Sequence, residues 1–316
     1  MTENLVDGRA LDRPGGAARR TSRWPRWLAD AVSPLMLTPT LLILSVFVYG
    51  FVLWSIVISF TSSKLIPKYD FVGLEQYIAL WSMDRWYVAI GNLAIFSILF
   101  IGLSVSLGLI LAIFLDQKIR GENAIRSIYL YPMAISFIVT GTAWKWILNP
   151  GLGIEKLVRG WGWTDFSFDW LVNPSMAIYT LVIAAVWQSS GFAMAIFLAG
   201  LRGVDGEVVK AAKIDGAGTW LTYRAIVIPM LRPVFLTVFV VLTYQAVRSF
   251  DLVISLTGAG PGFASDLPAT FMYQMAFSRN RMSLSAASAV MIFMTVAAIM
   301  VPYIYSELRR EVKNER

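Results

Sequence analysis

Side chains that could hold a small molecule stand inside two long apolar runs of the sequence. They are amides, hydroxyls and aromatic rings: Gln188, Ser189, Phe192, Tyr244, Gln245 and Ser249. Amides and hydroxyls exchange hydrogen bonds with the hydroxyls of a carbohydrate, and aromatic rings pack against the apolar faces of its rings. This combination predicts a path or a binding site for a sugar.

The sequence offers few groups for catalysis. The chain contains no His and no Cys, which removes the commonest general base, the commonest zinc ligand and the thiolate nucleophile. The apolar runs also lack a pair of carboxylates. The motif G-x-x-x-x-G-K-[ST], which cradles the phosphates of ATP, does not occur. An integral membrane enzyme is therefore the weakest interpretation, and we expect no cofactor in the chain itself.

The composition places these residues in a membrane. Hydrophobic residues make up 57% of the 316 residues, only 15% are charged, and the mean hydropathy is +0.63. Soluble domains carry about a quarter charged residues. Six apolar stretches reach the roughly 20 residues that a helix needs to cross a bilayer. They cover Pro34–Phe60, Val88–Leu115, Ser127–Leu148, Met176–Leu201, Leu231–Leu256 and Leu284–Tyr305.

The sequence thus predicts an all-α polytopic membrane protein with six transmembrane helices. We expect a basic segment over 1–33, a first helix with its outer loop over 34–87, a core over 88–306 and a tail over 307–316. Eighteen Lys and Arg fall in segments that are cytoplasmic if the N-terminus is, and seven fall outside, so both termini should be cytoplasmic. The net charge of +7 follows this topology and does not indicate nucleic acid. Contact of the clustered N-terminal Arg with anionic membrane lipid is one interpretation, and a solvated segment that only sets the topology is the preferred one.

Two charged residues lie deep in the predicted fifth span. Arg248 and Asp251 are three residues apart, which would place them on one face of a continuous helix. A charge inside a membrane is expensive and marks a functional site by default. We favour an Arg248–Asp251 pair as a structural lock over direct contact of these residues with a solute.

A long cytoplasmic loop between the fourth and fifth spans contains its own helix and turn signals. Asp205 is a candidate N-cap for a short helix that ends near Lys213, and Asp215-Gly216 is a turn signal. A second short helix over Gly218–Ala225 leads towards Pro229. The predicted helix–turn–helix would expose Ala211, Ala212 and Gly216, whose small size permits close approach of a partner.

The same loop carries a resemblance to a known family. K-A-A-K-I-D-G-A, followed by I-V-I-P-M-L-R-P, resembles the EAA loop of binding-protein-dependent ABC importer permeases. Lys210 stands where that family usually has Glu. L-T-G-A-G-P at 256–261 resembles the L-T-G-G-G-P loop of its maltose-type carbohydrate group, and the runs around 151–153, 169–171 and 200–205 are similar to the α-glucoside branch. The coupling residues implied by the resemblance are Glu207, Lys210, Ala211, Ala212, Asp215, Gly216, Ala217 and Pro229.

The resemblance implies a type I ABC importer transmembrane domain in a bacterial-type plasma membrane. It implies a second, homologous permease, two copies of a cytosolic ATPase that bind ATP-Mg, an extracytoplasmic solute-binding protein and a sugar substrate. The EAA-type loop would sit in a cleft of the ATPase, whose closure would turn the helices from inward-facing to outward-facing. The fourth and fifth spans would approach the solute, at the residues named above together with Arg248 and Asp251.

The main alternative is a secondary, ion-coupled solute transporter. Such proteins often have inverted repeats and interrupted helices at matched positions. The sequence shows neither feature, and acidic residues within the spans are scarce. An importer subunit driven by a separate ATPase is therefore the preferred interpretation.

Overall fold

The computed structural model describes residues 38–64, 66–117 and 120–314. The chain divides into two compact units, residues 1–53 and 54–316. The predicted basic segment over 1–33, and the start of the first span at Pro34, lie outside the described residues. Of the first unit, the structure describes a helix that contains the π-helical segment η1 (Ser45–Tyr49) and runs on as α2 (Gly50–Ser59). Over residues 38–53 its apolar side chains are exposed, as lipid-facing residues are.

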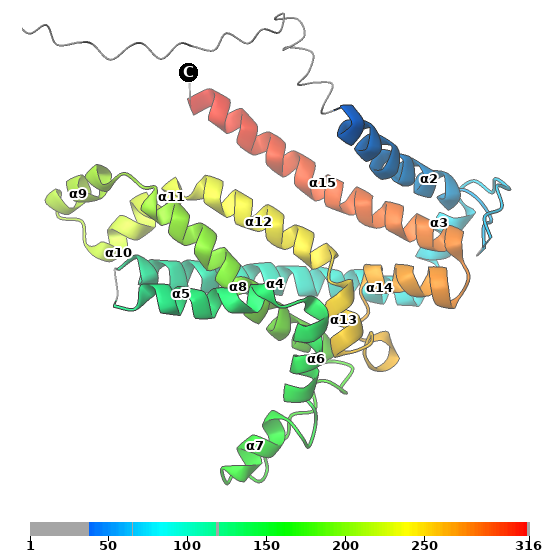
Figure 1. Cartoon of the computed structure of the whole chain (residues 1–316), viewed down its shortest axis with the longest axis horizontal. Coiled ribbons are helices and arrows are strands. Elements are labelled where there is room, and N and C mark those ends of the chain that lie inside the picture. The colour runs from blue at the N-terminus through cyan, green and yellow to red at the C-terminus, as the bar shows by residue number, and fades with distance from the viewer. Residues whose placement is uncertain (1–37, 65, 118–119, 315–316) are drawn as a thin grey trace, which may run out of the picture. The chain divides into compact units, whose positions relative to one another are not determined.

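The described part of the second unit is helical apart from loops and one isolated β-bridge. Figure 1 shows the course of its helices. In chain order the elements are α3 (Glu75–Trp81), α4 (Asp84–Asp116), α5 (Glu122–Leu130), η2 (Tyr131–Ala134), α6 (Phe137–Ile147), α7 (Ile154–Gly160), α8 (Ala177–Arg202), α9 (Gly206–Ile214), α10 (Thr219–Thr222), η3 (Tyr223–Val227), α11 (Ile228–Met230), α12 (Arg232–Val247), α13 (Phe250–Leu256), η4 (Pro261–Phe263), α14 (Pro268–Tyr273), η5 (Gln274–Ser278) and α15 (Met282–Asn314).

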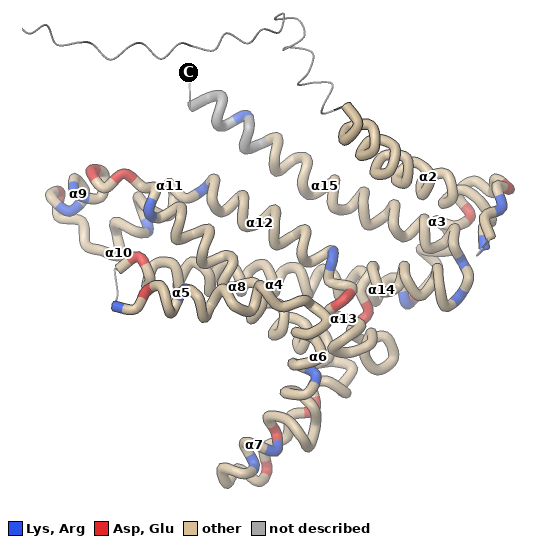
Figure 2. The backbone as a smooth tube through the Cα atoms, in the orientation of Figure 1, with Lys and Arg blue, Asp and Glu red and all other residues tan. Residues whose placement is uncertain are grey.

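Four of the predicted spans are continuous helices. They are Thr38–Ser59, Asp84–Asp116, Ala177–Arg202 and Met282–Tyr305, each long and apolar enough to cross a bilayer. Figure 2 shows α4 and α8 free of charge over most of their length, with the charged residues concentrated near helix ends and in loops. The second, fourth and sixth predictions are confirmed within a few residues, and the first is confirmed over its described part.

The third and fifth spans are interrupted, which corrects the expectation of continuous helices. In the third, the segments Glu122–Ala134 and Phe137–Ile147 meet at a bend of 101°. Pro132, which lacks a backbone donor, lies in the first turn of the 3₁₀ segment η2, and Ile135 after it is extended. Ser136 then caps α6 by accepting from the Val139 N–H at 3.4 Å.

In the fifth span, α12 ends at Val247 and α13 starts at Phe250, with Arg248 and Ser249 in the turn between them. A second bend of 65° separates Thr219–Met230 from Arg232–Val247. Interrupted helices therefore occur in this chain, and their supposed absence is no argument against an ion-coupled transporter.

Helix α8 forms the centre of the second unit. It contacts α4, α5, α6, α12 and α13, and most of its side chains are buried. Small residues allow these helices to approach closely, as is usual in membranes. A Cβ on Gly108 of α4 would lie 2.6 Å from the Ala193 Cβ of α8, and a Cβ on Gly191 would fall on the backbone carbonyl of Tyr129 in α5.

We expect Gly191→Ala to lower the stability of the folded chain by about 1–3 kcal/mol, the usual effect of overpacking a core. The new methyl group meets a backbone carbonyl, which cannot rotate away as a side chain can. Thermal unfolding of the detergent-solubilised protein would measure the change. Gly102→Ala in α4 is the matched control, because a Cβ there meets nothing within 4 Å. Equal unfolding temperatures for the two variants would contradict the predicted contact.

Candidate functional site

A cavity of about 250 Å³ lies where the two interrupted spans meet α8. It is lined by Met133, Phe137, Gln188, Ser189, Phe192, Val241, Tyr244, Gln245 and Arg248. Six of the eight residues proposed for a solute path are among them. Ser249 and Asp251 are not. Backbone that leaves the regular helix is tolerated at membrane depth where it lines a cavity or is buried in protein, and both breaks fit that condition.

Polar side chains of α8 tie both interrupted spans together. The Gln188 amide donates to the Ile135 carbonyl at 2.7 Å, and so satisfies an acceptor at the break before α6. The Ser189 hydroxyl donates to the Gln245 amide oxygen of α12 at 2.8 Å. Both α8 residues are buried. Gln188 and Ser189 therefore fix the wall of the cavity, and the more accessible groups are Tyr244, Gln245, Phe192 and Arg248.

These contacts also fix the depth of the cavity. Helix α8 has 26 residues and is about 39 Å long at 1.5 Å per residue, so Ser189 stands at its middle. The bond from Ser189 to Gln245 places the last turn of α12 at the same level. Arg248 follows within one helical turn. The cavity and its cation consequently lie near the middle of the central span.

The expected Arg248–Asp251 lock is absent. The Arg248 guanidinium donates to the Tyr244 hydroxyl at 3.1 Å, and the ion pairs among the described residues do not include it. The reason is the helix break. Arg248 follows the last residue of α12, whereas Asp251 lies in the first turn of α13, where the helix dipole stabilises its negative charge. The Ser249 hydroxyl bonds back to the carbonyls of Gln245 and Ala246, both at 2.9 Å.

The predicted helix–turn–helix is present as α9 and α10. Asp205 caps α9 by accepting from the Glu207 N–H at 2.9 Å, and Gly216 forms the turn with a φ of +83°. The Ala217 N–H returns to the Ala212 carbonyl at 2.9 Å. Lys210 pairs with Glu207 at 2.8 Å on the exposed side of α9. The prediction of two short helices with a turn at Asp215-Gly216 is confirmed.

Two details of this loop differ from expectation. Ala212 is buried, at 7% exposure, because it faces inward, whereas Ala211 and Gly216 are exposed. The second helix does not end near Ala225 but continues through η3 and α11, past Pro229, to Met230. The exposed side of the loop is apolar at Ile214 and Trp220, which are 85% and 74% exposed.

The loop is joined to the rest of the second unit at the end of α4. The Gln117 amide donates to the Tyr223 hydroxyl at 3.1 Å. A cavity of about 520 Å³ lies behind the loop, between α9, α10 and the ends of α4 and α8. Figure 1 shows α9 and α10 side by side at the left of the second unit. The loop thus presents an apolar outer surface and contacts the helix ends through its inner one.

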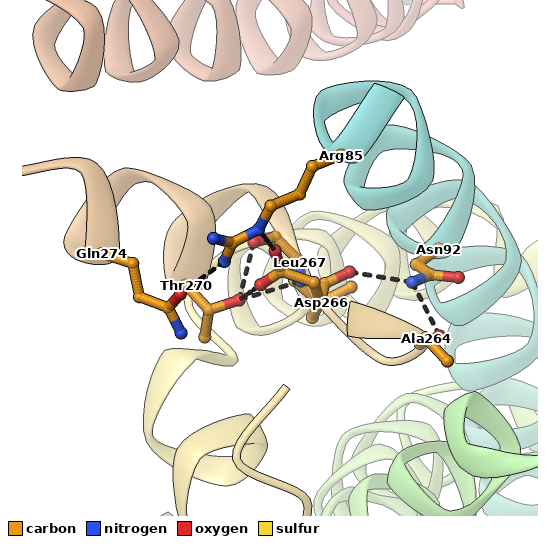
Figure 3. A network of polar contacts seen from close by, with 7 residues as sticks. All are labelled: Arg85, Asn92, Ala264, Asp266, Leu267, Thr270 and Gln274. Carbon is orange, nitrogen blue, oxygen red and sulfur yellow. Dashed lines mark hydrogen bonds and ion pairs between the residues drawn. The ribbon is translucent and has the colours of Figure 1, made fainter. Parts of the chain in front are cut away.

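A buried polar network at the other end of α4 escaped the sequence reasoning (Figure 3). Arg85 donates to the Asp266 carboxylate and to the Gln274 amide oxygen, both at 2.7 Å. Asp266 also accepts from the Thr270 hydroxyl at 2.5 Å. Asn92 donates to the carbonyls of Ala264 and Asp266 at 2.9 and 3.0 Å. Arg85 and Asn92 are 172–189 residues from their partners in sequence, so no local spacing could reveal these contacts.

Comparisons with known proteins agree with this arrangement. The family model described as "Binding-protein-dependent transport system inner membrane component" matches residues 104–310. A probable ABC transporter permease protein of Pyrococcus horikoshii is 39% identical over 279 residues, covering 88% of this chain and 96% of the relative. The xylose/arabinose import permease protein XacH of Haloferax volcanii is 34% identical and covers 85% of each chain.

A more distant relative matches in sequence, and a solved structure matches in fold. The trehalose/maltose transport system permease protein MalF of Thermococcus litoralis is 29% identical, over 85% of this chain and 91% of the relative. A crystal structure of a bacterial ABC transporter involved in the import of the acidic polysaccharide alginate superposes with a TM-score of 0.78 at 18% identity, over 90% of this chain and 97% of that chain. The fold is that of a type I ABC importer transmembrane domain. The chain belongs to the family of binding-protein-dependent transport system inner membrane components.

Proposed function

We propose that this chain is the permease subunit of an ATP-driven importer for an α-glucoside or a related oligosaccharide. The observation that carries the proposal is the cavity near the middle of α8, lined by amides, a hydroxyl, aromatic rings and a guanidinium. Hydrogen-bonding groups combined with aromatic rings suit a carbohydrate. The names of several relatives include sugars, among them xylose, arabinose, trehalose and maltose.

The energy would come from separate chains. The proposal includes two copies of a cytosolic ATPase that bind ATP-Mg, a second homologous permease and an extracytoplasmic solute-binding protein. The α9–α10 loop would dock on the ATPase from the cytoplasmic side, and its exposed Ile214 and Trp220 offer the apolar surface that a stable contact needs. Both chain termini would be cytoplasmic. An expressed four-component complex that retains the ATPase through purification would support this assembly.

Solute uptake by the assembled transporter in vesicles tests the proposal directly. We expect ATP-dependent accumulation of at least one α-linked glucoside from a panel of labelled oligosaccharides. Accumulation that persists without the ATPase subunit and follows an ion gradient would instead identify an ion-coupled transporter.

We expect Tyr244→Ala to raise the KM for uptake about tenfold or more. Tyr244 is 59% exposed at the cavity and offers a ring face and a hydroxyl, and removing such a contact typically costs at least about 1.4 kcal/mol, which is a factor of ten. Phe293→Ala is the control, since it truncates an aromatic residue of α15 that is similarly exposed and does not line the cavity. A larger effect from Phe293→Ala than from Tyr244→Ala would argue against a solute site at this cavity.

A further inference from the structure

The cavity between the two helix breaks carries an unbalanced charge. Among the nine described residues that line it, Arg248 is charged and the others are aliphatic, aromatic, amide or hydroxyl side chains. The four ion pairs found in the described part of the chain involve other residues. The cavity therefore holds a positive charge with no carboxylate of the described chain within ion-pair distance.

The guanidinium is held in place, yet most of it is available. Its Nη1 donates to the Tyr244 hydroxyl at 3.1 Å, and its carbon lies 5.9 Å from the centre of the Tyr244 ring. Tyr244 is one turn earlier in α12, so the helix itself sets this arrangement. An arginine has five N–H donors, and within the described residues only this one is used. The remaining donors are free for a ligand.

The position of Arg248 at the end of α12 does not account for its presence. A cation at a helix C-terminus is favoured by the helix dipole, but that effect is several-fold smaller than the cost of a charge near the middle of a membrane. Arg248 stands within one turn of the residue that bonds the middle of α8. A charge at this depth needs a counter-charge or a wet cavity, and the cavity is where such a counter-charge would bind.

The chemistry of arginine indicates which counter-charge fits. The planar guanidinium binds the two oxygens of a carboxylate or phosphate in parallel, and it is less hydrated than an ammonium. Gln245 and Phe192 beside it supply an amide for hydroxyls and a ring for an apolar sugar face. We propose that the transported oligosaccharide carries an anionic group, a carboxylate or a phosphate, and that Arg248 is the residue that selects it. This inference rests on the proposed importer function.

A matched pair of solutes tests the inference in the assembled transporter. Maltobionate and maltitol both carry an α-glucosyl unit on an open-chain sugar, and they differ by the carboxylate; maltose 6-phosphate with maltose is the phosphate pair. Uptake into vesicles is divided by the separately measured occupancy of the solute-binding protein, so that the receptor's own preference cancels. We expect kcat/KM for one anionic solute to exceed that for its neutral partner at least tenfold.

Substitution of Arg248 should abolish this preference. Arg248→Gln is expected to lower the anionic-to-neutral ratio of kcat/KM at least tenfold, and Arg248→Lys to retain part of it. Arg279→Gln, which changes an exposed arginine away from the cavity, should leave the ratio unchanged. An equal loss for both members of a pair would assign the guanidinium to neutral hydroxyls and overturn the inference.

Two further outcomes separate this inference from the function on which it rests. If the Arg248→Lys complex assembles and the Arg248→Gln complex does not, the guanidinium pairs with an acid of the partner permease, which also overturns the inference. Uptake of neutral maltose with no preference for the anionic solutes would refute the inference that the substrate is anionic, and it would still support the proposed importer function. A complex that carries none of the four solutes and shows no solute-stimulated ATP hydrolysis would count against the importer itself.

Discussion

Gly216→Pro should abolish solute uptake while the chain still inserts into the membrane. Gly216 has a φ of +83°, whereas proline fixes φ near −65°, so the turn between α9 and α10 cannot form with proline. Membrane insertion depends on the apolar spans, which the substitution leaves untouched. The measurement is ATP-dependent uptake in vesicles, together with the amount of permease in the membrane fraction and the amount of ATPase that co-purifies with it.

Variants at two neighbouring glycines separate the turn geometry from the docking surface. Gly216→Asn should retain most of the uptake, because asparagine adopts left-handed backbone conformations more readily than other side chains. Gly218→Ala is the matched control, since Gly218 has an ordinary φ of −67° and, like Gly216, open space where a Cβ would lie. Gly216→Ala and Gly216→Trp share the strain of a side chain at positive φ, and a Cβ there meets no atom of the described chain within 4 Å, so a larger loss for Gly216→Trp than for Gly216→Ala would place a partner surface beside the turn. Normal uptake and normal ATPase retention in Gly216→Pro would refute the coupling role.

Asp266→Ala should lower the free energy of unfolding by about 3–5 kcal/mol, the usual effect of breaking a buried ion pair. The Asp266 carboxylate is fully buried and the Arg85 side chain is 10% exposed, so neither water nor salt can replace the lost partner. The guanidinium also stacks on Phe263, with 3.8 Å between its carbon and the ring centre, and cannot easily turn away. A large fall in the unfolding temperature of the detergent-solubilised chain is the expected result.

An exposed ion pair in the same chain supplies the control. Glu207→Ala removes the partner of Lys210, where both side chains are at least 70% exposed, and should change stability by less than about 1 kcal/mol. Adding Arg85→Met to Asp266→Ala should recover part of the loss, since the buried charge is then removed together with its partner. If Asp266→Ala and Glu207→Ala unfold at the same temperature, the Arg85–Asp266 pair does not anchor this end of α4.

The sequence was sufficient for features that depend on neighbouring residues. The apolar lengths of Asp84–Asp116, Ala177–Arg202 and Met282–Tyr305 identified three spans closely, because hydropathy is a local property. The Asp205 cap and the Gly216 turn were likewise predictable, since each is decided within four residues. Six of the eight proposed path residues also line one cavity.

Features that depend on distant contacts were missed. The break before α6 is stabilised by Gln188, 53 residues later, and the Arg85–Asp266 pair joins residues 181 apart. The fifth span reads as one apolar run, so the turn at Arg248 was invisible and the Arg248–Asp251 spacing suggested a pair that the break prevents. The spacing of two residues along the sequence predicts a shared helix face only if the helix is unbroken between them.

The bond between Gln188 and Ile135 also constrains how the chain is made. The carbonyl of Ile135 emerges from the ribosome 53 residues before the amide that satisfies it, a delay of roughly 3–10 s at ordinary rates of synthesis. A kink formed before Gln188 is present would leave an acceptor that lipid cannot solvate. We therefore expect the third span to reach its final position in the bilayer only after the fourth has been synthesised, and the two spans to leave the translocation machinery together.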